Sequence, residues 1–293
     1  MHKAGFVNIV GNPNVGKSTL MNQLVGEKLS IATFKAQTTR HRIMGIVNTE
    51  DTQIVFSDTP GVLKPNYKMQ EMMLQFSESA LADADVLLYV TDVIENPEKN
   101  MDFLEKVAKM TIPVILLINK IDESDQSKLV DLVEKWHGLL PDAEILPISA
   151  KNKFGTDILM KRVRELLPES PAFFDKDQLT DKPARFFVSE IIREKILRYY
   201  DKEIPYSVEV VVERFKEDDR QIHINAVIYV ERSSQKGIII GHQGMALKKM
   251  STEARKSLER FFDKKIFLET FVKVDKDWRN SQKELNNFGY NPE

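Results

Sequence analysis

The 293-residue sequence contains no cysteine, no long apolar run and no recognisable leader segment. Without cysteine, disulfides, thiolate zinc sites and cysteine nucleophiles are excluded. The absence of an uncharged apolar run of 18 residues argues against a membrane-spanning helix. The first residues, MHKAGF, lack the apolar core and cleavage site of a signal peptide. These absences predict a cytoplasmic protein, with peripheral contact on the inner face of the cell membrane left open.

Charge is nearly balanced: 42 basic and 44 acidic side chains give a net charge of −2 at pH 7. As an average, this value argues against nucleic-acid binding. The distribution is uneven, because the residues before Thr180 carry −5 and those after it carry +3. Residues 232–265 alone hold nine basic and three acidic side chains. This basic segment is a candidate surface for a polyanion.

The length predicts two domains, since a typical single domain has ~150 residues. An acidic segment with three prolines, residues 168–183, separates two differently patterned halves. Such composition is typical of a connection between domains. We therefore expect a linker over 172–182 and domains at 1–171 and 183–293.

The first half alternates apolar runs with helical stretches. Runs such as VLLYV and VILLI lack polar alternation, which is typical of strands buried on both faces of a parallel sheet. The pattern predicts an α/β, doubly wound, mostly parallel sheet, with 40–48 as an antiparallel edge strand beside 53–58. The other strands are expected at 6–10, 86–92, 113–120 and 144–149, and helices from Lys17 and at 68–82, 98–109, 127–139 and 156–167.

A phosphate-binding loop is predicted between the first strand and the first helix, where G-N-P-N-V-G-K-S fits G-x-x-x-x-G-K-[ST]. In such a loop, backbone N–H groups cradle phosphates, Lys17 reaches the β- and γ-phosphates and the Ser18 hydroxyl is a ligand of Mg²⁺. The residues expected to bind here are Gly11, Asn12, Pro13, Asn14, Val15, Gly16, Lys17, Ser18 and Thr19.

Two further elements are expected beside these phosphates. The segment D-T-P-G ends a strand, so Asp58 can reach Mg²⁺ through water and the Gly61 N–H can reach the γ-phosphate. Thr39 is the preferred hydroxyl to complete the Mg²⁺ shell, with Thr38 as the alternative. The residues expected to contact the nucleotide from this segment are Asp58, Thr59, Pro60, Gly61 and Val62.

A guanine site is predicted at two later strand ends, N-K-I-D and S-A-K. Asp122 can accept hydrogen bonds from the guanine N1–H and amino group, which adenine does not present in that arrangement. The Asn119 amide is expected on the N7/O6 side, and the Ala150 N–H is expected to donate to O6. The residues expected to bind the base are Asn119, Lys120, Ile121, Asp122, Ser149, Ala150 and Lys151.

These elements in this order resemble a translation-factor-class GTPase domain. More narrowly, Q-T-T-R-H at 37–41 together with D-T-P-G at 58–61 resembles the Era family of ribosome-assembly GTPases. The resemblance implies binding of GTP and GDP and hydrolysis of GTP with Mg²⁺. The residues implied to act in catalysis are Lys17, Thr39, Asp58, Gly61 and Asn14.

Two positions depart from Ras-type GTPases. Val62 stands where those proteins carry a water-orienting glutamine, so we expect slow intrinsic hydrolysis. Asn14 resembles the asparagine of potassium-activated GTPases, which implies that Asn14 and the loop 30–35 hold K⁺. The simpler interpretation of Asn14 as a turn asparagine stays open.

The second half is predicted as α+β, with helices at 184–202 and 245–262, strands at 207–215, 221–231 and 265–274, and a Gly-rich turn before the second helix. That helix is expected to bury Leu247, Met250, Ala254, Leu258 and Phe261. The segment G-H-Q-G fits the G-x-x-G loop of KH domains, which clamps about four nucleotides. The order of elements resembles the type II KH domain of the Era family.

That resemblance implies binding to the single-stranded 3′ end of small-subunit (16S) ribosomal RNA and a role in assembly of the 30S subunit. His242 and Gln243 stand where KH loops usually carry Lys or Arg, which leaves more of the phosphate attraction to nearby lysines. The residues expected to bind RNA are Lys236, Gly237, Ile240, Gly241, His242, Gln243, Gly244, Lys248 and Lys249.

Two other functions stay open. One is a peripheral membrane-associated signalling GTPase whose basic C-terminal surface meets anionic lipid. The other is a GTP-binding scaffold without turnover, which Val62 would permit. No obligate protein partner is evident. In the preferred interpretation, nucleotide state orders the loops near 30–40 and 59–72 and so alters how the RNA domain is presented.

Overall fold

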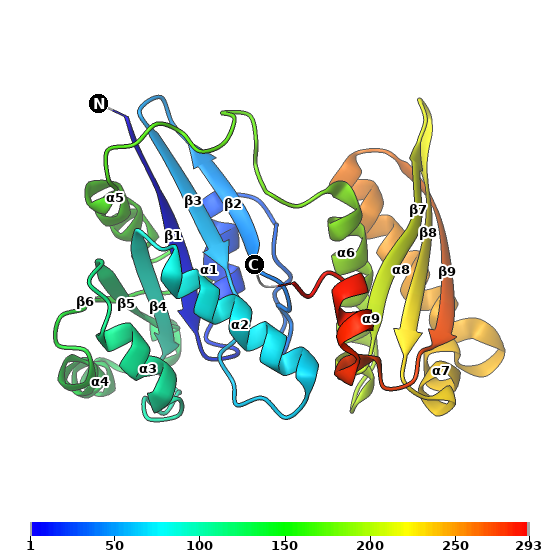
Figure 1. Ribbon diagram of the computed structural model, residues 1–293, viewed down its shortest axis with the longest axis horizontal. Helices are drawn as coiled ribbons and strands as arrows, with labels where there is room; N and C mark the ends of the chain where they lie inside the picture. The colour runs from blue at the N-terminus through cyan, green and yellow to red at the C-terminus, as the bar shows by residue number, and fades with distance from the viewer. Residues whose placement is uncertain (1, 292–293) are drawn as a thin grey trace. The chain divides into compact units, whose positions relative to one another are not determined.

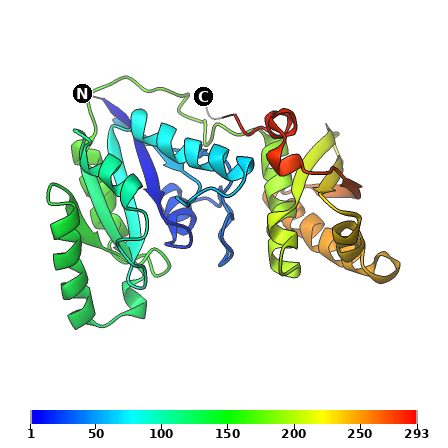
Figure 2. The same ribbon diagram turned by 60° about the horizontal axis from the view of Figure 1, so that its bottom comes forward.

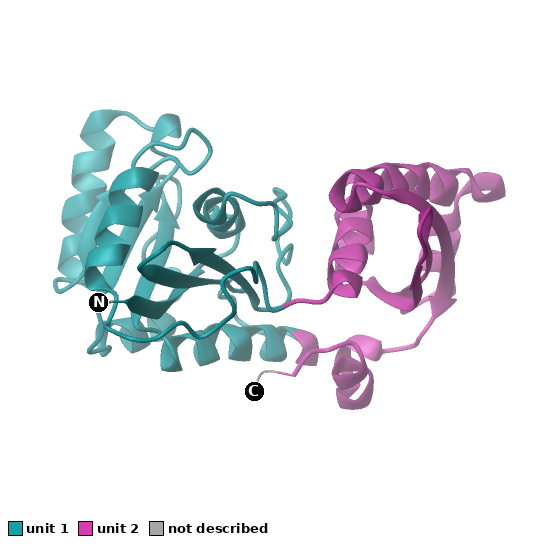
Figure 3. Ribbon diagram, turned by 90° about the horizontal axis from the view of Figure 1, so that it is seen from above, with its two compact units in different colours: residues 1–66, 70–181, 292–293 teal, residues 67–69, 182–291 magenta. Residues whose placement is uncertain are grey.

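The computed structural model describes residues 2–291, which form two compact units, coloured separately in Figure 3. Unit 1 contains residues 2–66 and 70–181, and unit 2 contains residues 67–69 and 182–291. Each unit has its own hydrophobic core. None of the described helices has the length and apolar character needed to cross a membrane.

Unit 1 is built on a six-stranded sheet in the order β2-β3-β1-β4-β5-β6 (Figure 1). All neighbouring strands are parallel except β2 and β3, which confirms both the mostly parallel sheet and its antiparallel edge strand. The central strands are buried on both faces, as their unbroken apolar runs predict. The strands are β1 (Lys3–Gly11), β2 (Ile43–Asn48), β3 (Thr52–Asp58), β4 (Val86–Asp92), β5 (Val114–Asn119) and β6 (Glu144–Pro147).

Helices cover both faces of this sheet (Figures 1 and 2). Trp136 of α4 and Phe103 of α3 pack with Leu116 and Tyr89 in one cluster, which α2 joins through Ala80. Helices α1 and α5 contact each other on the other face. This arrangement brings the carboxyl ends of the parallel strands to one edge of the sheet. The helices are α1 (Lys17–Val25), α2 (Lys68–Ala82), α3 (Met101–Ala108), α4 (Gln126–Leu139) and α5 (Thr156–Leu166).

The segment after α5 is hydrogen-bonded along the edge of this sheet. The Ile46 N–H donates to the Leu179 carbonyl over 2.8 Å, and the Thr180 hydroxyl donates to the Met44 carbonyl over 2.7 Å. The buried side chain of Gln53 accepts the N–H groups of residues 173 and 174 over 2.7 and 3.0 Å. Most of the predicted linker is therefore attached to β2 and β3.

Unit 2 has the element order helix, strand, strand, helix, helix, strand. Strand β8 pairs antiparallel with β7 and parallel with β9, and the helices pack against one face of this sheet. The predicted α+β class is confirmed. The elements are α6 (Ala184–Tyr199), β7 (Glu209–Glu217), β8 (Gln221–Val230), α7 (Ser233–Ile240), α8 (Met245–Phe262), β9 (Lys265–Val274) and a short terminal α9 (Gln282–Asn287).

The structure differs from the sequence-based prediction in two places of unit 2. The expected Gly-rich turn is helical over Ser233–Ile240, because Gln235 caps the helix and the side chain of Ile239 anchors it in the core of unit 2. These contacts outweigh the roughly 1 kcal/mol that Gly237 costs inside a helix. The second difference is Phe261 of α8. The sequence predicts that it is buried, but it is 41% exposed, whereas Met250 of the same predicted face is fully buried.

Candidate nucleotide site and nucleic-acid groove

A cleft of about 410 Å³ opens beside the loop that joins β1 to α1. The loop that follows α1 and the residues beyond β3 and β5 close its other sides. The lining residues are Pro13, Asn14, Gly16, Lys17, Ser18, Thr19, Ile31, Ala32, Thr33, Phe34, Lys35, Gln37, Thr38, Thr39, Gly61, Ile94, Lys120 and Glu123.

The phosphate-binding loop needs glycine at both of its ends. Gly11 has φ +144°, and a Cβ there would lie 2.1 Å from the Val90 carbonyl oxygen. Gly16 has φ +96°, and a Cβ would lie 2.3 Å from Asn119 Nδ2. Within residues 2–291, no side chain caps the start of α1, so its first backbone N–H groups are available to an anion.

Lys17 is held in place by the phosphate-binding loop itself. Its Nζ donates to the carbonyls of Gly11 and Asn12 over 3.0 and 2.8 Å, and its side chain is buried. Burial lowers the pKa of Lys17 to about 8, although the charges of Asp58 and Glu95 oppose this shift. A cation poised this close to deprotonation gains strongly from an anionic ligand.

The structure brings the three predicted Mg²⁺ ligands together. Ser18 Oγ lies 2.8 Å from Thr39 Oγ1, which lies 3.3 Å from Asp58 Oδ2. Thr38 instead donates to the Lys35 carbonyl over 2.5 Å and lies 2.7 Å from the Thr33 hydroxyl. Of the two candidate threonines, Thr39 is therefore the one beside Ser18 and Asp58.

Asp58 is fully buried, and burial raises the pKa of its carboxyl group, while Lys17 and nearby hydroxyls oppose the rise. Among the described residues, its Oδ1 atom has no hydrogen-bond partner. A buried carboxylate oxygen without a partner is costly unless a ligand, ion or water fills the place. This orphaned oxygen marks the position where the residues fit a hydrated cation.

The predicted base-binding residues lie around Asn119. Its amide donates to the Val15 carbonyl over 2.8 Å, and its Oδ1 accepts the Ala150 N–H over 2.9 Å. Ser149 Oγ donates to Asp122 Oδ1 over 2.6 Å. Asn119 thus ties the phosphate loop to the S-A-K segment, a positioning role that the motif alone does not predict. The Ala150 N–H, expected to meet guanine O6, is donated to Asn119 here.

Lys120 also forms a hydrogen bond to the phosphate-binding loop. Its Nζ donates to the Asn14 carbonyl over 2.7 Å and pairs with Asp92 over 2.5 Å. Asn14 has φ +66° and Lys120 has φ +62°, both in the left-handed region. Lys120 also lines the cleft, and its role in covering a base stays a prediction.

Two residues of this site, Asn100 and Glu95, carry no motif signal. Asn100, at the start of α3, contacts Asn12 Oδ1 and donates to the Val62 carbonyl over 3.1 Å. Glu95 accepts from Thr91 Oγ1 over 3.0 Å, and burial raises its carboxyl pKa. The only sequence signal for Asn100 is an asparagine before a helix, which is common.

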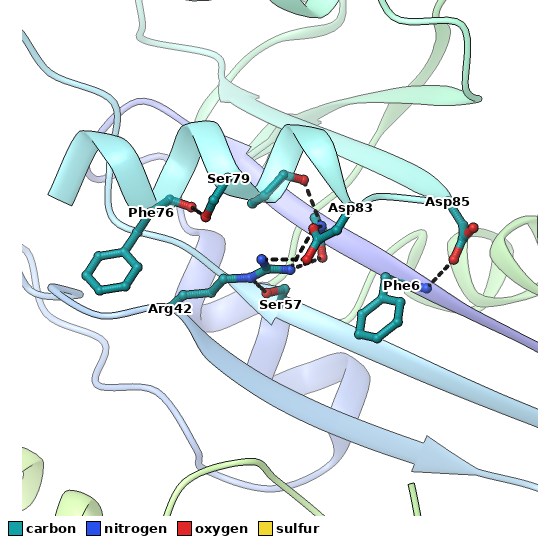
Figure 4. A network of polar contacts seen from close by, with 9 residues as sticks. Phe6, Arg42, Ser57, Phe76, Ser79, Asp83 and Asp85 are labelled. Carbon is teal, nitrogen blue, oxygen red and sulfur yellow. Dashed lines mark hydrogen bonds and ion pairs between the residues drawn. The ribbon is translucent and has the colours of Figure 1, made fainter. Parts of the chain in front are cut away.

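A partly buried polar network joins the start of β2 to the end of α2 (Figure 4). Arg42 donates to both carboxylate oxygens of Asp83 over 2.8 and 2.9 Å and to Ser57 Oγ over 2.5 Å. Asn8 accepts from Arg42 and donates to Asp83. Since Arg42 follows Thr39 closely in the chain, this network anchors the cleft loop to the sheet.

In unit 2, the predicted RNA-binding loop connects α7 to α8. Gly241 has φ +72°, and a Cβ there would lie 2.5 Å from the Ala246 Cβ, while Gly244 has φ +77°. A groove of about 310 Å³ runs between α8 and β9. Its lining residues are Gly244, Leu247, Lys248, Ser251, Thr252, Arg255, Leu268 and Thr270.

The predicted basic residues divide around this groove. Lys248 lines it, whereas the Lys249 amine lies 5.4 Å from the centre of the Tyr199 ring. Lys236 is half-buried on α7, and Ile240 packs against the core of unit 2. Arg255, which the prediction did not place at the site, also lines the groove and pairs with Glu259 over 2.6 Å.

Two family models match the chain. A "50S ribosome-binding GTPase" model matches residues 6–120, and a "KH domain" model matches residues 203–279. Together with the cleft and the groove, these matches define a GTPase of the P-loop class that carries a KH domain.

Full-length relatives narrow this class. The chain is 46% identical to GTPase Era from Geotalea daltonii over 98% of this chain and 97% of the relative. It is 43% identical to GTPase Era from Clostridium kluyveri over 99% and 100%, respectively. The chain belongs to the Era family of GTPases.

Solved structures agree with this assignment. Crystallised Era in complex with MgGDPNP and nucleotides 1506–1542 of 16S ribosomal RNA is 37% identical, with a TM-score of 0.95 and 99% of both chains covered. A variant of Aquifex aeolicus Era bound to GDP·AlF₄⁻ is 38% identical, with a TM-score of 0.94 and 98% and 99% covered. The predicted family and fold are confirmed.

Proposed function

We propose that this chain is a GTP-hydrolysing switch that binds the single-stranded 3′ end of 16S ribosomal RNA and assists assembly of the 30S subunit. The observation that carries the GTPase part is the cluster of Ser18, Thr39 and Asp58 beside the buried Lys17 amine. Guanine selectivity follows from Asp122, whose carboxylate is an acceptor for the N1–H and amino group of that base.

Different residues of the site act on the phosphates and on the approach of the D-T-P-G segment. The backbone N–H groups from Asn14 to Ser18 and the Lys17 amine hold the phosphates and neutralise charge that develops on them. The Gly61 N–H donates a hydrogen bond to the γ-phosphate. A Cβ on Gly61 would lie 2.7 Å from the Pro13 Cα, so only glycine lets this segment approach the loop.

The residues present fit Mg²⁺. Hydroxyl and carboxylate oxygens are the ligands that this ion prefers, and the unpartnered Asp58 Oδ1 is placed to accept from a water of its shell. Ser18 and Thr39 would hold the ion, with Asp58 acting through water. A bound Mg²⁺ would supply positive charge that offsets the negative charge of the phosphates.

Val62 cannot orient the attacking water, because its side chain is buried in the core of unit 1. Slow intrinsic turnover follows. We extend the proposal to K⁺: Asn14 and the loop 31–35 line one cleft, where a monovalent cation would supply the missing positive charge. Phosphate release should be severalfold faster in K⁺ than in Na⁺, and replacing Asn14 by alanine should abolish the difference. Equal rates in the two salts would remove K⁺ from the proposal.

RNA binding is proposed for the groove between α8 and β9. Gly244 lies where α8 begins, Lys248 lines the groove one turn further along, and Arg255 lines it about three turns along, which suits a nucleic-acid backbone that is clamped at the G-x-x-G loop and follows the helix. The related complex that contains 16S ribosomal RNA supports the same partner for this chain. A role in assembly of the 30S subunit supports the cytoplasmic location proposed for this chain.

Two assays test these functions separately. GTP turnover with Mg²⁺ should fall at least ~100-fold in Asp58→Asn, since an essential charge near the phosphates is lost. The exposed Asp142→Asn should match the wild type, and ATP should be a poor substrate for both. Equal turnover by Asp58→Asn and the wild type would contradict the assigned site.

For RNA, we compare a variant with acids inside the loop, His242→Asp with Gln243→Asp, and a charge-matched variant on α9, Asn286→Asp with Asn287→Asp. Binding of an A/C-rich oligonucleotide should weaken ~10-fold or more only in the first, through repulsion of phosphates. Equal binding by both would reject the groove.

The membrane alternative is not favoured, because the related complex contains ribosomal RNA. Peripheral membrane contact remains a separate prediction of the basic segment. Sedimentation with anionic and neutral vesicles tests it, and equal recovery from both would contradict it.

A further inference from the structure

The three-stranded sheet of unit 2 has a second, open face. Even-numbered side chains of β8 and β9, such as Ile224 and Ile266, are buried with the helices. Side chains alternate along a strand, so the odd-numbered ones lie on the opposite face. There, Phe267 and Phe271 are 49% and 48% exposed. Two large aromatic side chains left in solvent on one strand indicate a contact surface.

The cross-strand neighbours show the chemistry of this face. The His223 ring lies opposite Phe267, with 5.5 Å between their centres. At one end, Phe288 lies against Tyr229 at 5.3 Å. We call the surface formed by His223, Asn225, Phe267, Glu269 and Phe271 the open face.

The rim of the open face is more basic than acidic. By strand register, Arg214, Lys216, Lys265 and Lys273 share this side of the sheet. Their acidic neighbours are Glu269 on β9, Glu213, which pairs with Lys273 over 2.9 Å, and Asp218, which lies 3.5 Å from His223. The rim keeps one excess positive charge, which favours an anionic partner.

The open face is continuous with the proposed RNA groove. Leu268 and Thr270 line the groove, and Phe267 and Phe271 alternate with them along the same strand. Strand β9 is the edge of its sheet. A nucleic-acid strand that leaves the groove therefore needs to cross one edge strand to reach the aromatic rings.

We propose that the open face binds unpaired bases of the same RNA strand that occupies the groove, with bases stacked on Phe267 and Phe271. Exposed aromatic rings on an open sheet are a known platform for bases, and a basic rim suits their phosphates. A protein partner would instead favour an apolar patch depleted of charge at its centre, where this face carries Glu269. The inference rests on the proposed RNA-binding function.

The test compares two unpaired A/C-rich RNAs, one of about six nucleotides, enough for the groove, and one extended on both sides to about fourteen. The wild type should bind the longer RNA more tightly. In Phe267→Ala with Phe271→Ala, the affinity for the longer RNA should fall ~10-fold or more towards that of the short RNA, whose affinity should stay unchanged. Equal loss for both RNAs, or no loss for either, would overturn the proposal.

Four control variants test simpler explanations. Phe267→Leu with Phe271→Leu keeps apolar bulk without an aromatic ring and should lose the gain from length, whereas the tyrosine pair should keep it. Phe261→Ala removes another exposed phenylalanine, on α8, and should bind both RNAs like the wild type. The loop variant with acids at 242 and 243 should lose binding of the short RNA. If it binds the short RNA like the wild type, the groove is rejected, and the open face is then judged from the effect of RNA length alone.

A spectroscopic readout separates stacking from stability. Phe267→Trp places an indole on the open face, and its fluorescence should be quenched by the longer RNA and not by the short one. Quenching by neither RNA, while the longer RNA still binds, would contradict stacking at this position. The two native tryptophans are both buried, so the new signal is distinguishable.

Discussion

At the scale of single residues, Lys17 links burial to nucleotide binding. Burial lowers the pKa of its amine to about 8, and a bound phosphate would raise that pKa by stabilising the charged form. Binding therefore takes up a proton above pH 8, and affinity is lost as the pH rises through the lowered pKa. We expect GDP affinity to fall about 10-fold between pH 7 and pH 9, measured by titration calorimetry. Lys17→Arg, which stays charged, should show a flat profile, and a flat wild-type profile would contradict the argument.

The two adjacent threonines offer a second test at this scale. Thr39 Oγ1 lies beside Ser18 and Asp58, whereas Thr38 Oγ1 is bonded within its own loop. Thr39→Ala should lower the GTP hydrolysis rate by roughly 100-fold and raise the Mg²⁺ concentration needed for half-maximal turnover. Thr38→Ala should change the rate by less than about 10-fold, through loop order alone. The reverse ranking would assign the Mg²⁺ ligand to Thr38.

At the scale of elements, Gln53 of β3 holds the start of the segment 173–181 against the edge of the sheet. Its buried amide accepts from Phe173 and Phe174 and donates to the Phe174 carbonyl. Gln53→Leu removes these partners, which should cost about 1–3 kcal/mol of unfolding free energy and speed amide exchange over 173–181. Gln235→Leu removes a similar buried cap in α7 and should leave that exchange unchanged. Unchanged protection at 173–181 in Gln53→Leu would mean that the strand edge alone holds the segment.

These elements also show what the sequence can predict. Unbroken runs such as VLLYV specify buried parallel strands, and the motif at 11–18 specifies a loop that glycine alone permits at its ends. Local sequence pattern does not predict a residue's role where that role depends on a partner distant in the chain. Gln53 has the pattern of an ordinary strand residue, although it forms hydrogen bonds to a segment 120 positions later. The role of Asn100 is equally hard to predict from local sequence, because its partners Asn12 and Val62 follow the ends of other strands. In α7, a buried cap and Ile239 override the glycine that suggests a turn.

At the scale of the whole molecule, nucleotide and RNA sites must be joined by a coupling free energy if the protein is a switch. The physical route available in unit 1 starts at Thr39, passes into β2 and reaches residues 179–181, which are bonded along that strand. Whatever the route, linkage is reciprocal: a nucleotide that changes RNA affinity by a given factor has its own affinity changed by the same factor.

We expect RNA affinity to differ between the GDP state and the state with a non-hydrolysable GTP analogue by ~5- to 150-fold. RNA should then shift the ratio of GDP to analogue affinity by that same factor, measured by competition on one protein sample. Matching factors would establish coupling within the folded chain. Equal RNA affinity in both states would make the chain a GTPase and an RNA-binding module that share a polypeptide without a switch between them.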